Sequence, residues 1–130
     1  MSEAISFHYG IISYDFHTYF KLNDEEDREY ALKFRESIEK EFEKELTEGS
    51  ARIFRFFEKE IGPHPKEHGM FEVDTRSPSV YLKLLNYYQI NHGHLSVLIH
   101  PRTNAGELID HTKHALWLGE KQDLKLEVLS

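Results

Sequence analysis

The fold is decided by the stretch Ile11-Ile12-Ser13-Tyr14-Asp15-Phe16-His17-Thr18-Tyr19-Phe20, because its residues alternate in character. One parity carries Ile12, Tyr14, Phe16, Thr18 and Phe20, and the other carries Ser13, Asp15, His17 and Tyr19. Successive side chains of a β-strand point to opposite faces. The alternation therefore predicts a strand with an apolar core face and a polar, chemically capable opposite face.

The segments around this strand show helix or strand periodicity in a regular order. Asn23 or Asp24 is a suitable N-cap for the first predicted helix, and Gly49 is a suitable residue to end it. Residues 104–107 form a plausible capping box for the last predicted helix. Helices are predicted over 24–46, 80–88 and 108–116 (the last ended by Gly119), and strands over 51–61, 70–75, 95–99 and 124–128. The βαββαβ core of this order predicts an α+β fold, a ferredoxin-like two-layer sandwich, as a single domain over 1–130.

In such a sandwich the helices cover one face of the sheet only. The opposite face, with Asp15, His17 and Tyr19, must be solvated, lie in a pocket, or pack on a second subunit. The chain has nine Phe and seven Tyr, and a small two-layer domain with aromatic-rich strands has apolar surface to spare. We therefore expect a homodimer.

Composition excludes several classes of function. The chain has 130 residues, no cysteine and a formal net charge of −7. It cannot form disulfides, thiolate zinc sites or a cysteine nucleophile, and its acidic balance argues against nucleic-acid binding. The start, Met1 to Ser6, lacks the basic and apolar parts of a signal peptide, and no apolar run approaches the roughly 20 residues that cross a membrane. A soluble, cytoplasmic protein is expected.

Histidine is the most informative residue type. Nine occur, and five of them (His17, His64, His92, His94 and His100) lie in three short blocks at the ends of patterned segments. Neutral imidazole is the commonest protein metal ligand, and its unperturbed pKa lies near neutrality. The blocks therefore favour a metal or acid–base site over the alternative of scattered histidines that are solvated or satisfied within the core.

Three of these histidines could share one ion. The first and fourth strands of a ferredoxin-like sheet are neighbours, which brings His17 near His100, and His64 is held in a stiff turn between two prolines. Three imidazoles, or two with a carboxylate from Asp15 or Glu72, would make an open site for a divalent metal. His111 and His114 lie three apart on the last predicted helix, where a solvated pair is as good an interpretation as a metal pair.

Several blocks, in order, resemble one family. They are Phe16-His17-Thr18-Tyr19-Phe20, Gly62-Pro63-His64-Pro65, Met70-Phe71-Glu72-Val73, Leu95 to Thr103, and Asp110-His111 through Trp117-Leu118-Gly119. Over Ile11 to Gly119 the chain resembles the DOPA 4,5-dioxygenase family. The resemblance implies a ferredoxin-like fold, dimerisation, a non-haem metal that is ferrous iron for activity, and extradiol opening of a catechol such as 3,4-dihydroxyphenylalanine.

Two positions depart from the family pattern. The family usually has His-x-His in the first strand, where this chain has Asp15 before His17, and it usually has Asn-Arg-Gly where this chain has Asn91-His92-Gly93. Asp15 could serve as a carboxylate ligand or as a base, or could mark altered activity. His92 would change how an acidic substrate tail is held, because Arg grips a carboxylate with two donors and His cannot.

The resemblance leads to one hypothesis and one alternative. In the hypothesis, Fe(II) on His17, His64 and His100 binds a small aromatic diol and dioxygen, and Asp15 or His111 is the catalytic base; zinc could occupy the site in isolated protein. Tyr19, Phe71 and Trp117 are possible walls of the substrate pocket or parts of the core. The alternative is a non-catalytic ferredoxin-like dimer that binds a metal or small molecule on its open sheet face.

Overall fold

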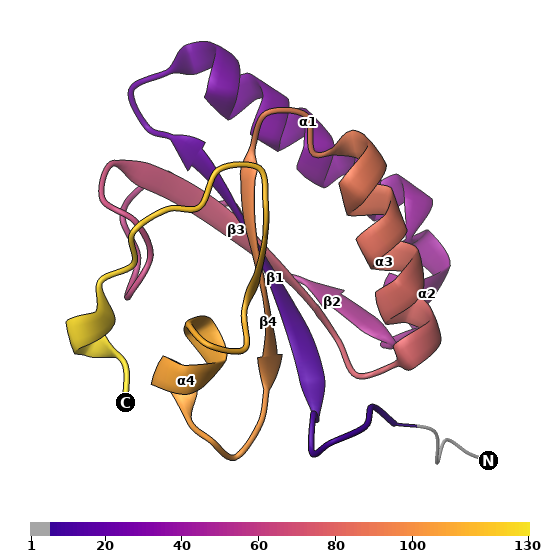
Figure 1. Cartoon of the computed structure of the whole chain (residues 1–130). Helices are drawn as coiled ribbons and strands as arrows, with labels where there is room; N and C mark the ends of the chain where they lie inside the picture. The colour runs from indigo at the N-terminus through magenta and orange to yellow at the C-terminus, as the bar shows by residue number, and fades with distance from the viewer. Residues whose placement is uncertain (1–5) are drawn as a thin grey trace.

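One antiparallel sheet forms the centre of the computed structural model, which describes residues 6–130 (Figure 1). Its strands lie in the order β2-β3-β1-β4-β5. They span Ala51–Ile53 (β2), His68–Thr75 (β3), Ser13–Lys21 (β1), Ser96–Arg102 (β4) and Leu116–Leu118 (β5). The first four have the ferredoxin-like order, so the predicted α+β class and the neighbouring positions of β1 and β4 are confirmed. The prediction that the N-terminal residues are not a signal peptide concerns Met1 to Ile5, which lie outside the described residues.

Three helices cover one face of the sheet (Figure 1). They are α1 (Glu25–Glu41), α2 (Glu43–Glu48) and α3 (Pro78–Asn91). The predicted N-cap is correct, since the Asp24 side chain accepts a hydrogen bond from the Asp27 amide. The single helix predicted over 24–46 is instead two, because the backbone at Phe42 leaves helical geometry while its ring stays fully buried. Among residues 6–130, no helix combines the length and apolarity that crossing a membrane requires.

The apolar parity of β1 builds the core under these helices. Phe16 and Phe20 are fully buried with Phe34 and Ile38 of α1 and Leu84 of α3. The predicted alternation of the first strand is therefore confirmed on its apolar side. Aromatic rings pack against one another in this core, for example Phe16 against Tyr88 at 4.7 Å between centroids, and such aromatic pairs add to the stabilisation from burial.

The opposite face of the sheet is covered by the chain itself. The short helix α4 (Glu107–His111) and the 3-10 turn η1 (Leu126–Val128) lie over it together with the loops around them (Figure 1). Asp15, His17 and Tyr19 are consequently buried. The sequence allowed this face to be solvated, to line a pocket or to pack on a second subunit. In the structure it lines a pocket within one chain.

Three predicted elements were wrong. The strand expected over 51–61 ends at Ile53, because Phe56 turns inward to stack on Phe20, and the chain rejoins β3 at a single Phe57–Met70 bridge. The helix expected over 108–116 ends at His111, and the following residues instead pair with β4 as β5; long-range pairing overrides local helix propensity here.

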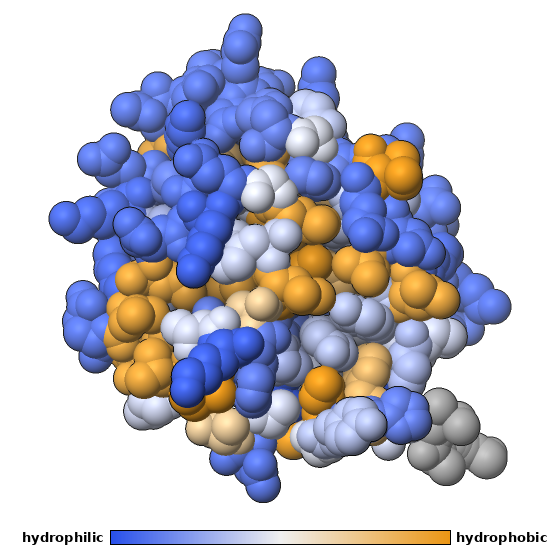
Figure 2. All heavy atoms as spheres, viewed as in Figure 1, coloured by the Kyte–Doolittle hydropathy of each residue, from blue (hydrophilic) through white to orange (hydrophobic). Residues whose placement is uncertain are grey.

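The predicted capping box is also absent, since Gly106 is the N-cap of α4 and no side chain caps that helix. The edge strand expected over 124–128 is the 3-10 turn η1. Exposed apolar side chains lie on these late segments, namely Leu108, Leu116, Leu126 and Val128, and Figure 2 shows apolar surface on the side where the C-terminal segment lies. Homodimerisation, which would cover such surface, stays a prediction.

Candidate metal centre

The site lies on the polar face of the three central strands. Asp15 of β1 is opposite His100 of β4 on one side and Asp74 of β3 on the other, and His17 is opposite Glu72. Directly paired residues share a face of the sheet. The parity that sends Phe16 into the helical core therefore sends these side chains into the second layer, under α4.

Three imidazoles converge at this point. The Nε2 atoms of His17 and His100 are 3.1 Å apart, and the ring of His111, from α4, lies 3.9 Å from the His100 ring between centroids. One nitrogen from each of the three lies within 4.8 Å of the others. Metal–imidazole bonds of about 2.0–2.1 Å would hold two ligand nitrogens of one ion roughly 3 Å apart, so the His17–His100 separation suits a shared ion.

Backbone carbonyls set the tautomers of two of these rings. Nδ1 of His100 lies 2.9 Å from the Pro101 carbonyl oxygen, and Nδ1 of His111 lies 2.8 Å from that of Glu107. A carbonyl oxygen only accepts, so each Nδ1 carries the proton and donates it. The lone pair of each ring is then on Nε2, the arrangement that metal-binding histidines commonly have.

Burial keeps the imidazoles of His17 and His100 neutral. It lowers the pKa of His100 to about 4 and that of His17 well below its ordinary value, and the neighbouring imidazoles lower both further. Neutral imidazole is the form that binds metals. The Nδ1 atom of His17 is also buried without a hydrogen-bond partner in residues 6–130.

Two carboxylates border the imidazoles. Oδ2 of Asp15 lies 3.5 Å from His100 Nε2 and 3.2 Å from Arg102 Nε, and Oδ1 is buried without a partner in the described chain. Oε1 of Glu72 lies 3.9 Å from His17 Nδ1. Burial raises the pKa of Asp15 to about 6, against the lowering effect of Arg102, and burial with the charge of Asp15 raises the pKa of Glu72 to about 7.

His64 belongs to the same cluster but has a different partner. Its ring lies 4.5 Å from that of His17 between centroids, and its Nδ1 is 2.6 Å from the hydroxyl of Tyr19. Burial raises the pKa of this hydroxyl well above its ordinary value and lowers the pKa of His64 to about 3. A protonated hydroxyl that donates to Nδ1 leaves the single proton of a neutral imidazole on Nε2. His64 is then a hydrogen-bond donor at Nε2.

A pocket of about 370 Å³ opens onto the cluster. Its lining includes Asp15, His17, His64, Glu72, His100, Arg102, Glu107 and His111. Imidazole nitrogens and carboxylate oxygens that point into one buried space, with two of their atoms unpaired, fit a divalent first-row metal ion. The cluster can therefore hold a metal.

Most of the residues predicted from the sequence meet in this pocket. Asp15, His17, His64, His100 and His111 line it, and Tyr19 lies behind His64. His92 does not line it; it is the C-cap of α3, and its Nδ1 faces the Leu95 carbonyl. Phe71 lies in the helical core and Trp117 packs on Tyr19, so neither is a wall of the pocket.

Two charged residues of the pocket were not predicted from the sequence, namely Arg102 and Glu107. Arg102 lies two residues after His100 on β4, so strand alternation could have placed it on the same face. Glu107 lies on the first turn of α4, and no sequence pattern indicated that it would reach the pocket. Among residues 6–130, two sets of three ligand atoms lie within 4.8 Å of one another: those of His17, His100 and His111, and those of Asp15, His17 and Glu72. Neither set contains His64. The ligand set of His17, His64 and His100 stays a prediction, with His111 as the geometrically favoured third member.

Known proteins resemble the chain across nearly its whole length. It is 37% identical over 90% of its length to an uncharacterized 21.2 kDa protein of Botryotinia fuckeliana, and 30% identical over 89% to a DOPA 4,5-dioxygenase of Amanita muscaria. It spans 63% and 49% of these two relatives. A crystal structure of a candidate dioxygenase from Nostoc punctiforme superposes with a TM-score of 0.75 at 32% identity, covering 92% of this chain and 91% of the other.

One family matches nearly the whole of this chain. The sequence model of the Dopa 4,5-dioxygenase family matches residues 14–128. That range starts at the second residue of β1 and ends on η1, so it contains the sheet except Ser13 and every residue of the imidazole cluster. The chain belongs to the DOPA 4,5-dioxygenase family.

Proposed function

We propose that this chain is a metal-dependent extradiol dioxygenase that opens the ring of a catechol with ferrous iron. In this reaction the carbon–carbon bond beside the two hydroxyl-bearing carbons breaks and both atoms of dioxygen enter the product, so no external reductant is needed. The observation that carries the proposal is the convergence of three imidazoles in a pocket, with the Nε2 atoms of two of them 3.1 Å apart.

His17, His100 and His111 would hold the ion. The carbonyl partners of His100 and His111 direct their Nε2 lone pairs away from the backbone, and three protein ligands leave positions open for substrate. When bound, the iron would lower the pKa of the catechol hydroxyls and offer dioxygen a site beside the ring. The sequence suggested His64 as the third ligand and His111 as a possible base. In this proposal His111 is the third ligand, and His64 is a hydrogen-bond donor.

Asp15 is the proposed base. Its carboxylate lies 3.5 Å from His100 Nε2, beside the position of a substrate oxygen, and Arg102 stabilises its ionised form from 3.2 Å away. It would accept the proton of one catechol hydroxyl. Arg102 also holds the carboxylate in place after the proton has moved.

His64 is the proposed hydrogen-bond donor. With Tyr19 donating to its Nδ1, its Nε2–H would face the pocket and donate to a substrate or dioxygen oxygen that gains negative charge. Preorganised donors aimed at developing charge are among the largest contributions to catalysis. Tyr19 would act through His64 and keep it in the donor tautomer.

The test is oxygen consumption by the protein reconstituted with Fe(II) under argon and then exposed to air-saturated buffer with a panel of catechols. We expect one dioxygen consumed per catechol, together with the yellow absorbance of a ring-opened semialdehyde. If iron binds but no catechol consumes oxygen, the reaction is refuted and the alternative of a non-catalytic metal-binding dimer is favoured.

Two histidine variants provide the controls. His100→Ala removes a proposed ligand and should abolish turnover. His68→Ala removes a histidine outside this pocket, on β3, whose Nδ1 contacts the Lys66 carbonyl, and should leave turnover unchanged. Equal loss in both variants would mean that the activity does not come from this cluster.

A further inference from the structure

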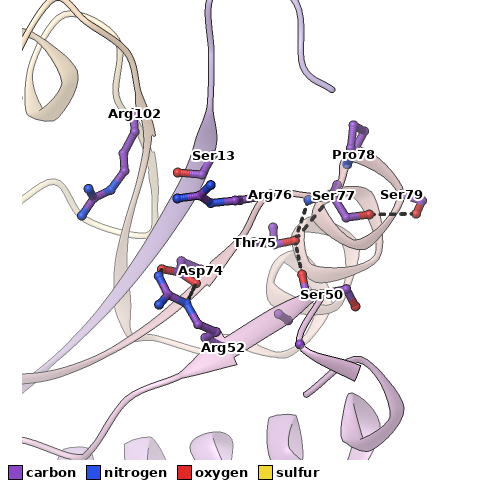
Figure 3. Close-up of a pocket in the computed structure, with 12 residues that line it drawn as sticks. Ser13, Ser50, Arg52, Asp74, Thr75, Arg76, Ser77, Pro78, Ser79 and Arg102 are labelled. Carbon is purple, nitrogen blue, oxygen red and sulfur yellow. Dashed lines mark hydrogen bonds and ion pairs between the residues drawn. The ribbon is translucent and has the colours of Figure 1, made fainter. Parts of the chain in front are cut away.

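A second cavity, larger than the imidazole pocket, lies beside it. Its volume is about 800 Å³. It is formed where the start of β1 and the end of β3 meet the first turn of α3 and the turn before β2 (Figure 3). Its lining includes Ser13, Ser50, Arg52, Asp74, Thr75, Arg76, Ser77, Ser79 and Arg102. We refer to this cavity as the arginine cleft.

Positive charge exceeds negative charge in the arginine cleft. Arg52 is neutralised by Asp74, with Nε and Nη2 at 3.0 and 2.6 Å from its two oxygens. Arg102 pairs with Asp15, whereas Arg76 forms no ion pair with any carboxylate of residues 6–130. Figure 3 shows the Arg76 side chain extended from the end of β3 toward β1. The guanidinium of Arg76 thus lines the cleft as an exposed group without an ion pair in the described chain.

The surrounding polar groups also suit an anion. The hydroxyls of Ser77 and Ser79 lie 3.2 Å apart at the start of α3, and this 14-residue helix directs the positive end of its dipole into the cleft. Asp74 is the one carboxylate in the lining, and both its oxygens are occupied by Arg52. An anion that entered would therefore meet donors and no free carboxylate of the lining.

Arg102 connects the cleft to the imidazole pocket, because it lines both. Ser13, in the cleft, lies two residues before Asp15 on the same strand and so on the same face. Two residues along a strand span roughly 7 Å. An aromatic ring held at the imidazoles would reach the cleft with a side chain of two or three carbons.

We propose that the arginine cleft binds the carboxylate of the substrate's side chain, and that Arg76 is the specificity-determining residue that selects an acidic catechol. This inference rests on the proposed function in one respect, namely that the substrate's ring is a catechol. The binding of an anion in the cleft is argued from the cleft alone. It also assigns the acidic tail to Arg76 and Arg102, in place of His92, which lies outside both cavities.

The experiment measures equilibrium binding, so it does not depend on turnover. 3-(4-Hydroxyphenyl)propionate and its uncharged amide are titrated anaerobically into the protein by calorimetry. We expect the acid to bind about tenfold more tightly than the amide, since a charge-assisted hydrogen bond is commonly worth that factor. Arg76→Gln should reduce the affinity for the acid to that for the amide and leave the amide unchanged. Arg55→Gln, which removes an exposed arginine outside both cavities, is the matched control.

The outcomes separate this inference from the proposed reaction. Equal affinities for acid and amide, or equal effects of Arg76→Gln and Arg55→Gln, would overturn it. Acetate that binds at Arg76 as tightly as the aromatic acid would also overturn it, because the cleft would then be a separate anion site. Arg76-dependent binding of the acid supports the inference even if no catechol is turned over, and in that case only the proposed reaction fails.

Discussion

Replacing His111 and His64 separately by Ala tests which imidazole completes the metal site. The sequence favours His64 as the third ligand, whereas the geometry favours His111, whose nitrogen lies within 4.8 Å of those of His17 and His100. In contrast, the hydrogen bond of His64 joins it to Tyr19. We expect His111→Ala to weaken divalent-metal binding strongly and His64→Ala to weaken it little.

The expected difference follows from the number of ligands. Structural zinc sites with four ligands bind with roughly 10–16 kcal/mol, or about 3 kcal/mol for each ligand. Loss of one imidazole of three should therefore cost about 3 kcal/mol, which is roughly a hundredfold in affinity. His64→Ala removes no ligand and no hydrogen bond to a ligand, so its effect should stay below about tenfold.

Zn(II) competition against a chromogenic chelator measures this difference, because zinc is not oxidised during the titration. Both side chains are almost fully buried, so thermal unfolding of the metal-free variants shows whether each still folds. His111→Phe, which keeps the volume of the ring and lacks its nitrogens, is a second variant should alanine unfold the chain. A larger loss of affinity in His64→Ala than in both His111 variants would refute the reasoning and support the set of His17, His64 and His100.

Three further predictions address Glu72, Gly69 and Asp15. Burial raises the pKa of Glu72 to about 7, above the value of this group in the unfolded chain. The contribution of Glu72 to stability is therefore present below the unfolded pKa and is lost as pH rises through about 7. Denaturant unfolding of the metal-free protein should show Glu72→Gln gaining about 1–3 kcal/mol relative to wild type between pH 5 and 8, and a difference independent of pH would contradict this. A Cβ at Gly69 would collide with the Phe20 ring and the Phe57 carbonyl, so Gly69→Ala should destabilise by roughly 1–3 kcal/mol; an unchanged melting temperature would show that this backbone can shift. Asp15→His restores the family's His-x-His pair and should strengthen Zn(II) binding while abolishing any catechol turnover, and retained turnover would mean that Asp15 is not the base.

The fold was predictable because its strongest signals are local. The alternation around Phe16 and His17 and the helical spacing of Phe34 and Ile38 each reflect one element facing one core. The ladder between β1 and β4 then brings His17 to His100, so this part of the site followed from topology alone.

The remaining part of the site depends on contacts that no local pattern encodes. His111 reaches the cluster because α4 stops after five residues and β5 returns to pair with β4. The hydroxyl and amide of Thr103 bind the two oxygens of Asp110, at 2.7 Å each, and so hold the chain before α4 against the first turn of that helix. The Tyr19–His64 hydrogen bond joins residues that are 45 apart in the chain. Periodicity cannot reveal such pairs, so the sequence alone gives no sign that the Tyr19 hydroxyl contacts Nδ1 of His64.

Trp117 is the chain's single tryptophan, and its position gives the protein an intrinsic optical probe. Its ring lies 6.0 Å from that of Tyr19, whose hydroxyl in turn binds His64. When only tryptophan is excited, the emission of the protein therefore originates at a ring that Tyr19 separates from His64 of the imidazole cluster. Ligand entry, loss of the tyrosine hydroxyl or displacement of α4 can be followed in solution by this one emission band, with no added label.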